Sequence, residues 1–318
     1  MADTILVFEF VSAGGMPGHP DEATLQPIGV AMRDAVAADL LQLPADRIGQ
    51  VRVADSAGAP AHRDPGGRLH PVRARPGQPA LDFLAEQAAR HDGVWVIAPE
   101  SDGLLSACCA LVAPARWLGS TAAALRTSAS KTRTLARLAS AGLPTPWDFD
   151  APGQARRWVV KPDVGAGAVD TVVLDDHGAA QALAARRTAA GACVTLQPWV
   201  DGDALSLSLL CGTGVRPSLL SLNRQHLHCS ASGQLDYIGV THTGADARDP
   251  RWPALQAMAD AIAEALPGLR GFVGIDLVWH AQHGPVPIEV NARVTNAYAG
   301  LSDALGRNLA SEVLRACR

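Results

Sequence analysis

Hydrophobic and polar positions follow two different patterns along this chain of 318 residues. In the first part, short apolar runs predict strands at residues 4–11, 50–54 and 93–98, and helical spacing predicts helices at residues 25–41, 81–90 and 103–112. Because single strands alternate with single helices, we expect a parallel α/β unit over about the first 115 residues. The segment 58–79 is rich in Pro, Gly and Arg, which predicts a long surface loop.

The alternation of strands and helices ends near residue 128. Apolar runs then predict strands at residues 158–161, 171–174, 194–200, 204–210 and 217–223, and helical spacing predicts helices at residues 131–141, 179–188 and 252–266. Several of these strands follow one another without an intervening helix. We therefore expect the second part of the chain to form a pair of α+β lobes.

The last two predicted strands, residues 272–279 and 286–293, are joined by the predicted turn 281–284. Folding the chain about this turn places Asp276 opposite Glu289. Because side chains alternate between the two faces of a strand, one face carries Asp276, Glu289, Asn291 and Arg293 and the other carries Val273, Ile275, Leu277, Ile288 and Val290. The second face is apolar and suits a core.

The two opposed carboxylates predict a metal site. Carboxylates placed directly across a sheet repel each other. A hard cation held between them by oxygen ligands removes the repulsion, so we interpret Asp276 and Glu289 as ligands of a divalent cation. The alternative is a pair of solvated acids on an exposed face.

Charge and composition exclude several kinds of partner. The net charge is −4, the pI is about 6.2 and no basic stripe is present, so a nucleic-acid partner is not indicated. We see no signal peptide and no apolar run near the roughly 20 residues of a membrane span. The six cysteines form no C-x-x-C pair, so we expect free thiols and no disulfide framework. Free thiols in turn indicate the reducing cytoplasm.

A lysine and two glycines suggest a phosphate site. Lys161 ends a predicted strand and precedes a loop that contains Gly165 and Gly167. Backbone N–H groups of glycines can approach an anion closely because no Cβ intervenes. The loop matches neither the P-loop nor the G-x-G-x-x-G pattern, and the alternative is an ordinary turn.

Two further segments are candidates for ligand contacts. The backbone of Gln197-Pro198-Trp199-Val200 could pair with an adenine edge and Asp203 could reach a ribose hydroxyl, although Asp201-Gly202 also predicts a simple β-turn. Glu100 follows the predicted strand 93–98, where open α/β sheets bind ligands. It is a candidate substrate contact, and the alternatives are a helix N-cap acid or a residue of a solvated loop.

The segment 223–228 is polar, and its residues have more than one possible role. Asn223, Arg224 and Gln225 end a predicted strand and either contact phosphate or substrate or form a surface edge. His226 and His228 have no other Cys or His at a metal-ligand spacing, so we interpret them as structural or solvated.

The order of these features resembles the ATP-grasp superfamily of carboxylate–amine ligases. The resemblance rests on the helix with Lys131, the Lys161–glycine loop, the hinge-like strand, Asp276 and Glu289-Val290-Asn291-Ala292-Arg293. It implies an α/β pre-ATP-grasp domain at residues 1–120 and a two-lobed ATP-grasp domain at residues 121–318, with a small lobe at about 128–200 and a large lobe at about 201–318.

The resemblance also implies roles for these residues. Asp276, Glu289 and Asn291 would hold Mg²⁺ (or Mn²⁺). The nucleotide-binding set would be Lys131, Lys161, Gly165, Gly167, Gln197, Pro198, Trp199, Val200, Asp203 and Asn223. Many members of the family have Glu at the position of Gln197, which leaves any side-chain contact there open.

A closer resemblance is to the tyramine–glutamate ligases of methanofuran-type cofactor synthesis in archaea and methylotrophic bacteria. It is carried by Leu6-Val7-Phe8-Glu9-Phe10, Ala98-Pro99-Glu100 with Asp102-Gly103, Ser221-Leu222-Asn223-Arg224-Gln225 and residues 289–298. These enzymes join the γ-carboxyl of glutamate to the amine of tyramine.

The resemblance implies amide formation through an acylphosphate, with release of ADP and phosphate. Lys161 and Arg293 would act in catalysis, and Arg293 would steady the transferring phosphoryl group or the oxyanion. The partners would be a small carboxylate and a small amine, and a homodimer is possible because many relatives are dimers. The alternatives are a phosphotransferase of the same fold and a noncatalytic nucleotide-binding module.

Overall fold

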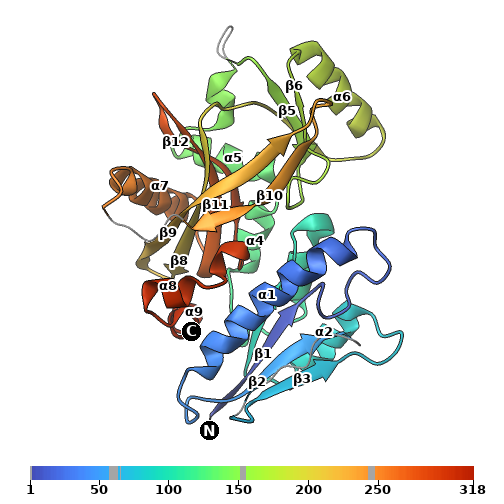
Figure 1. Cartoon of the computed structure of the whole chain (residues 1–318), viewed down its shortest axis with the longest axis vertical. Helices are drawn as coiled ribbons and strands as arrows, with labels where there is room; N and C mark the ends of the chain where they lie inside the picture. The colour runs from blue at the N-terminus through green and yellow to red at the C-terminus, as the bar shows by residue number, and fades with distance from the viewer. Residues whose placement is uncertain (1, 57–63, 65, 151–154, 243–247) are drawn as a thin grey trace.

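The computed structural model describes residues 2–56, 64, 66–150, 155–242 and 248–318, and its strands form three sheets (Figure 1). The first is a parallel sheet of order β3-β2-β1-β4. The other two are antiparallel, with the orders β6-β5-β7 and β10-β9-β8-β11-β12. The predicted change from parallel α/β to α+β structure is confirmed.

The parallel sheet lies at the bottom of Figure 1. Its strands are β1 (Asp3–Glu9), β2 (Ile48–Asp55), β3 (Leu69–Arg73) and β4 (Gly93–Ile97). The helices of this part are α1 (Glu22–Leu41), α2 (Ala80–Ala88), the short 3-10 helix η1 (Ser101–Gly103) and α3 (Leu104–Ala110). The predicted strands and helices are therefore present, with bounds that differ by a few residues.

The predicted loop 58–79 is wrong for residues 69–73, which form β3. This strand pairs in parallel with β2 and places Pro71 opposite Val53. Proline cannot donate to a ladder and is tolerated at a sheet edge, which is the position of β3. The proline and arginines of segment 58–79 are not typical of a strand, so its composition did not predict β3. Residues 57–63 and 65 lie outside the described part.

The three-stranded sheet lies at the top of Figure 1. It consists of β5 (Trp158–Pro162), β6 (Val172–Leu174) and β7 (Val194–Pro198), and is preceded by α4 (Ala122–Ser128), α5 (Lys131–Ser140) and the 3-10 helix η2 (Pro146–Phe149). Helix α6 (His177–Ala189) covers one face, where the rings of Trp158 and His177 stack 4.9 Å apart. The other face packs on Leu235 through Val159 and Val173.

The five-stranded sheet consists of β8 (Asp203–Gly212), β9 (Val215–Cys229), β10 (Leu235–His242), β11 (Gly271–His280) and β12 (Gly284–Asn291). The helices that accompany it are α7 (Trp252–Ala265), the 3-10 helix η3 (Asn296–Tyr298), α8 (Leu301–Leu305) and α9 (Leu309–Cys317). The stripe Leu255, Met258, Ala259 and Ile262 of α7 is buried in the core, as its spacing predicted. No helix in the described residues is long and apolar enough to cross a bilayer.

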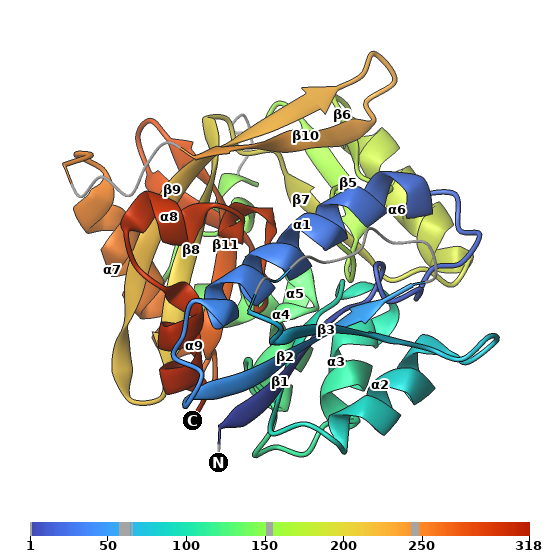
Figure 2. The ribbon, with the colours of Figure 1, turned by 60° about the horizontal axis from the view of Figure 1, so that its bottom comes forward.

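The hairpin of β9 and β10 is longer than the predicted strand 217–223. Beyond Asn223 its residues are mostly polar and exposed, so hydrophobic spacing gives no signal. The hairpin extends toward β6 (Figure 2), where Val173 N–H donates to Gly233 O over 2.8 Å and Leu235 N–H donates to Thr171 O over 2.9 Å. The hairpin tip thus joins the edge of the three-stranded sheet.

Candidate functional site

One row of residues crosses the five-stranded sheet from β9 to β12. Asp276 is paired with Glu289 on one side and with Ser206 on the other, and Ser206 is paired with Asn223. Directly paired residues present their side chains on the same face. The predicted opposition of Asp276 and Glu289 is confirmed, and Asn223 lies in the same row, where its amide donates to Ser206 O over 3.3 Å.

Two amides hold the carboxylate of Asp276. The Nδ2 of Asn291 donates to its Oδ2 over 3.2 Å, and the Nε2 of Gln225 donates to its Oδ1 over 2.8 Å. Burial, and then the charge of Glu289, raise the pKa of Asp276 to about 7, although both amides and Arg293 act in the opposite direction. The shift is the expected response of an acid that faces a like charge out of water.

A bulge between Asp276 and Leu277 changes the apolar face of the hairpin. The predicted core residues Val273, Ile275, Leu277 and Val290 are buried. Ile288 is not on that face and instead packs beside Phe149, Val200 and Val286. The extra residue of a bulge shifts the alternation of one strand, and a hydrophobic pattern does not reveal it.

The predicted phosphate lysines lie beside the two acids. The Nζ of Lys131, the first residue of α5, is 3.2 Å from Oε1 of Glu289 and donates to Gly165 O over 2.9 Å. Lys161 is buried, and its pKa falls to about 8 because of burial and then the charge of Lys131, against the attraction of Glu289 and Asp276. Two cations and two carboxylates therefore share one site.

These two lysines are the only lysines in the sequence, in which Lys and Arg together number 27. Arginine serves at every other basic position. Lysine carries a compact point charge that suits phosphate, whereas arginine prefers planar, two-point contacts. The rarity of lysine therefore points to this site independently of any sequence motif.

Asp163 anchors the segments that carry both lysines. Its carboxylate accepts hydrogen bonds from Ser130 Oγ over 2.6 Å, Thr132 N over 2.8 Å and Thr195 Oγ1 over 2.8 Å. Burial raises the pKa of Asp163, but the bonds from Ser130, Thr132 and Thr195 outweigh it and lower the pKa. The N-terminus of α5 thus already holds an anion from the chain itself.

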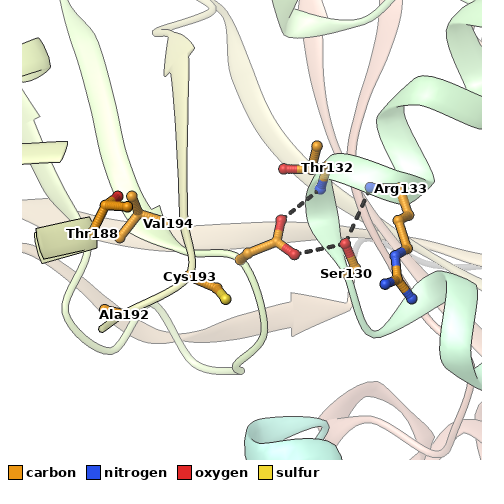
Figure 3. Close-up of a pocket in the computed structure, with 8 residues that line it drawn as sticks. Ser130, Thr132, Arg133, Thr188, Ala192, Cys193 and Val194 are labelled. Atoms are coloured by element: carbon orange, nitrogen blue, oxygen red, sulfur yellow. Dashed lines mark hydrogen bonds between the residues drawn. The ribbon is translucent and has the colours of Figure 1, made fainter. Parts of the chain in front are cut away.

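A cavity of about 370 Å³ lies beside the first residues of α5 (Figure 3). Ser130, Thr132 and Arg133 form one wall, and Ala192, Cys193 and Val194 form the other. Lys131 lies between Ser130 and Thr132 in sequence but contacts Glu289, away from this cavity. Ser130 and Thr132 of the first wall bond to Asp163, which also lines the cavity, whereas Asp276 and Glu289 do not line it.

The predicted glycine loop has a strained backbone. Gly167 adopts φ 71°, and the non-glycine residues Ala168 and Asp170 adopt φ 60° and 52°. Left-handed conformations are uncommon for residues with a Cβ and gather at functional sites. The loop also approaches the parallel α/β part, since a Cβ on Gly165 would lie 4.0 Å from Ser101 Oγ.

The hinge-like segment has one buried polar atom without a partner. The Oε1 of Gln197 has no hydrogen-bond partner among the described residues. Gln197 is paired with Val159 in the three-stranded sheet, in which β7 is an edge strand. Pro198 ends that strand, Trp199 N–H donates to Arg157 O over 2.8 Å, and Val200 is buried.

Asp203 begins β8 and is half exposed. Its carboxylate lies 3.6 Å from Arg224 and 3.7 Å from Arg251. These ion pairs account for its position, and its contact with a ribose stays a prediction.

Arg293 leaves the row of acids and binds Glu100. The predicted strand 286–293 is too long, because β12 ends at Asn291. The Nε and Nη2 of Arg293 donate to the two carboxylate oxygens of Glu100 over 2.9 and 2.8 Å. Glu100 stands at the N-cap position of η1, but its side chain makes no cap hydrogen bond, so the interpretation as a capping acid is wrong.

Sequence reasoning missed Tyr237, one of the two tyrosines. It lies on β10 opposite Leu227. Burial, and then the charge of Asp276, raise the pKa of Tyr237, whereas a hydrogen bond with Asn296 lowers it. A lone tyrosine in a polar segment was the available signal, but its approach to Asp276 depends on how the hairpin folds back.

No group of three or more His, Cys, Asp or Glu side chains in the described residues is arranged to hold a metal. His226 is exposed and lies 2.7 Å from Thr241 Oγ1, and all six cysteines are free thiols. The candidate metal ligands therefore remain two carboxylates and one amide, those of Asp276, Glu289 and Asn291.

Comparison with known proteins identifies two domains. A family model described as an ATP-grasp domain matches residues 128–297, and one described as a pre ATP-grasp 3 domain matches residues 51–125. Tyramine–L-glutamate ligase from Methanocaldococcus jannaschii is 31% identical over 110 residues, which are 33% of this chain and 31% of that protein. The match therefore spans about a third of each protein.

Solved structures share the fold over nearly the whole chain. An ATP-grasp superfamily protein from Archaeoglobus fulgidus has a TM-score of 0.67 at 20% identity and covers 99% of this chain and 88% of its own. D-alanine–D-alanine ligase from Bacillus anthracis, complexed with ATP, has a TM-score of 0.64 at 14% identity and covers 99% of this chain and 97% of its own. The chain therefore belongs to the ATP-grasp family, with a pre-ATP-grasp domain ahead of the ATP-grasp domain.

Proposed function

We propose that this protein joins a carboxylate to an amine through an acylphosphate and releases ADP and phosphate. One observation carries the proposal: the row that opposes Asp276 to Glu289 lies beside the ammonium groups of Lys131 and Lys161. This combination of charges suits a polyphosphate bound through a divalent cation. Membership of the ATP-grasp family supports the same class of reaction.

The residues of the row fit a magnesium ion. Asp276, Glu289 and Asn291 offer the carboxylate and amide oxygens that hard cations prefer. Burial, and then the like charge of Glu289, raise the pKa of Asp276, and a divalent cation between the two acids would offset both effects. When bound, the ion would neutralise the negative charge that develops on the phosphate during transfer. Mn²⁺ is an alternative ion with the same preference for oxygen.

We expect the nucleotide base to bind between the two antiparallel sheets. The buried oxygen of Gln197, which has no partner in the described residues, can accept a hydrogen bond from an exocyclic amino group. Apolar side chains of Val159, Val173 and Leu235 cluster on the same side of the small sheet. Gly165 and Gly167 would close over the phosphates and exclude water, and Asp203 and Asn223 stay candidates for ribose and phosphate contacts.

The reaction would proceed in two steps. A carboxylate oxygen of the substrate attacks the γ-phosphorus of ATP, the bond to the bridging oxygen breaks, and ADP leaves while Lys131 and Lys161 neutralise phosphate charge. The amine nitrogen then attacks the acyl carbon, phosphate leaves with the bonding electrons, and the nitrogen loses a proton. Arg293 would stabilise the transferring phosphoryl group or the oxyanion.

The best candidates for the substrates are the γ-carboxyl of glutamate and the amine of tyramine. The similarity to the archaeal tyramine–L-glutamate ligase supports this pair over about a third of the chain. Six free cysteines support a cytoplasmic location. A domain boundary near residue 120 and a homodimer remain predictions.

A screen of ADP release tests the proposal. Amino acids are combined with amines in the presence of ATP and Mg²⁺, beginning with L-glutamate and tyramine. We expect ADP, phosphate and an amide of the mass of both substrates less one water. Formation of AMP and pyrophosphate would contradict the acylphosphate mechanism.

The same assay separates the two alternatives. A phosphotransferase forms a stable phosphorylated product without an amine, whereas a ligase needs both substrates for product release. A noncatalytic module binds ATP and releases no ADP with any pair. The presence of Asp276, Glu289 and Asn291 together argues against the module, since binding alone has little need for all three.

A further inference from the structure

The contact between Glu100 and Arg293 joins the two domains at the site. Glu100 follows β4 of the parallel sheet, and Arg293 follows β12 of the large sheet. The two side chains are only 3% and 12% exposed, and both carboxylate oxygens take part, at 2.9 and 2.8 Å. Paired contacts of this kind fix the plane of a guanidinium as well as its position.

The hydrogen bonds of Arg293 leave part of its guanidinium available. A guanidinium has five N–H groups. Within the described residues, two of them bind Glu100 and one, on Nη1, binds Val294 O over 3.1 Å. The other two, one on each terminal nitrogen, remain for an anionic ligand.

The charges around Arg293 show why it needs a partner. Burial disfavours its charge, but Glu100, Glu289 and Asp276 together raise the pKa of Arg293. Without Glu100, the nearest acids would be Glu289 and Asp276, and the guanidinium would turn toward them. It would then compete with a divalent cation for the same carboxylates.

We propose that Glu100 is a positioning residue for Arg293 and does not contact the substrate. The proposal rests on the proposed function, in which Arg293 stabilises the transferring phosphoryl group or the oxyanion. Both oxygens of Glu100 are engaged and its side chain is buried, so neither oxygen faces a substrate ammonium. The pre-ATP-grasp domain thus orients a group that acts in the other domain.

The substitution Glu100→Gln tests the role, because it keeps the shape and removes the charge and one acceptor. With L-glutamate and tyramine, or the pair that the ADP screen identifies, we expect kcat to fall about 10- to 100-fold. The KM values of ATP, the carboxylate and the amine should stay within about threefold. An amine KM that rises about tenfold at constant kcat would make Glu100 a substrate contact and overturn the proposal.

A matched control comes from a second paired contact of the same geometry. Arg307 donates to Glu312 over 2.9 and 2.6 Å, in the C-terminal segment. Glu312→Gln removes the same interaction and should leave kcat within about twofold of the wild type. If this control loses as much activity as Glu100→Gln, the loss is a general effect on folding and the proposal fails.

A double variant separates positioning from independent action. If Glu100 acts through Arg293, the variant E100Q/R293A should have the kcat of R293A within about threefold. A further fall of the size seen for E100Q alone would show that Glu100 acts by itself and would overturn the proposal. If E100Q folds poorly, Glu100→Asp provides a second test. Its side chain keeps the charge but is too short for both contacts with Arg293, so we expect a kcat between those of the wild type and R293A.

The proposed function and this inference fail in different ways. A wild-type protein that releases no ADP with any pair would reject the ligase reaction. A wild-type protein that is active, together with E100Q that matches it in kcat and in every KM, would reject only the role of Glu100.

Discussion

Asp163 and Asp276 both lie near Lys161 but differ in how their surroundings change their pKa values. Asp163 accepts hydrogen bonds from Ser130, Thr132 and Thr195, and its pKa is lowered. Asp276 accepts bonds from two amides but faces Glu289, and its pKa is raised to about 7. The same side chain is thus stabilised as an anion in one place and destabilised in the other.

The difference indicates that Asp163 stabilises the fold, whereas Asp276 is suited to bind a metal ion. The donors around Asp163 all come from the chain, so its charge is balanced before any ligand binds. Asp276 shares its face with a second acid, and a divalent cation held between the two would stabilise both carboxylates. Burial raises the pKa of both acids, and only at Asp163 do the hydrogen bonds outweigh it.

The largest expected effect is on the rate of ADP release when the candidate metal ligand Glu289 is replaced. Glu289→Ala should lower the rate of ADP release by at least about 1,000-fold, because a metal contributes several kcal/mol to phosphoryl transfer. The unfolding temperature of the metal-free protein should change by no more than about 3 °C, since repulsion from Asp276 is also removed. Full activity in this variant would refute the metal assignment.

Lys161→Met is expected to have the second largest effect. The kcat should fall about 100-fold through loss of phosphate neutralisation, or about 2.7 kcal/mol. The nucleotide-free protein should become more stable, because burial already lowers the pKa of Lys161 to about 8. Arg186→Met on the exposed surface of α6 is the control and should change neither quantity. A less stable K161M protein would contradict this account.

Asp163→Asn should affect stability more than chemistry. Replacing an ionised acceptor of three hydrogen bonds should lower the free energy of unfolding by about 1–3 kcal/mol at pH 7 and kcat by about tenfold, through displacement of Lys131. Asp176, which caps α6 from an exposed position, provides the control Asp176→Asn. A 1,000-fold loss of kcat in D163N would remove the distinction between the two aspartates.

The sign of the pH dependence follows from the lowered pKa of Asp163. The unfolded chain binds a proton at the ordinary value of 3.8, and the folded protein does so only at lower pH. The stability from Asp163 is therefore present above about pH 3.8 and is lost as the pH falls through the folded pKa. Wild type and D163N should converge in chemical denaturation at acid pH.

Asp276 should show the smallest and opposite effect. Its folded pKa of about 7 lies above the ordinary 3.8, so the stability from its protonation is lost as the pH rises through about 7. The metal-free wild type should unfold roughly 2 °C higher at pH 6 than at pH 7.5, relative to D276N over the same interval. If stability changed with pH in the same direction for both aspartates, the contrast between Asp163 and Asp276 would be wrong.

The parts of the site that were predictable are local in sequence. Asp276 and Glu289 are joined by one short turn, so alternation alone places them opposite each other. Lys161 and its glycine loop are likewise neighbours. Alternation also placed Arg293 on the strand, because it cannot show that β12 ends at Asn291.

The parts that were not predictable depend on packing between distant segments. Glu100 and Arg293 are 193 residues apart, and Gln225 reaches Asp276 across 51 residues. No period of apolar residues reports such contacts. The strands β3 and β10 were missed for a related reason, since an edge strand and an exposed hairpin need little apolar surface.

The two lysines also define the chemistry of this protein toward reagents. They are the only side-chain amines in the sequence, and each is 6% exposed. Apart from the N-terminal amine, every site for acetylation or amine-directed labelling therefore lies in the candidate nucleotide site. The rate at which such a reagent modifies Lys131 and Lys161, followed separately from the N-terminal amine, would report how accessible that site becomes in solution.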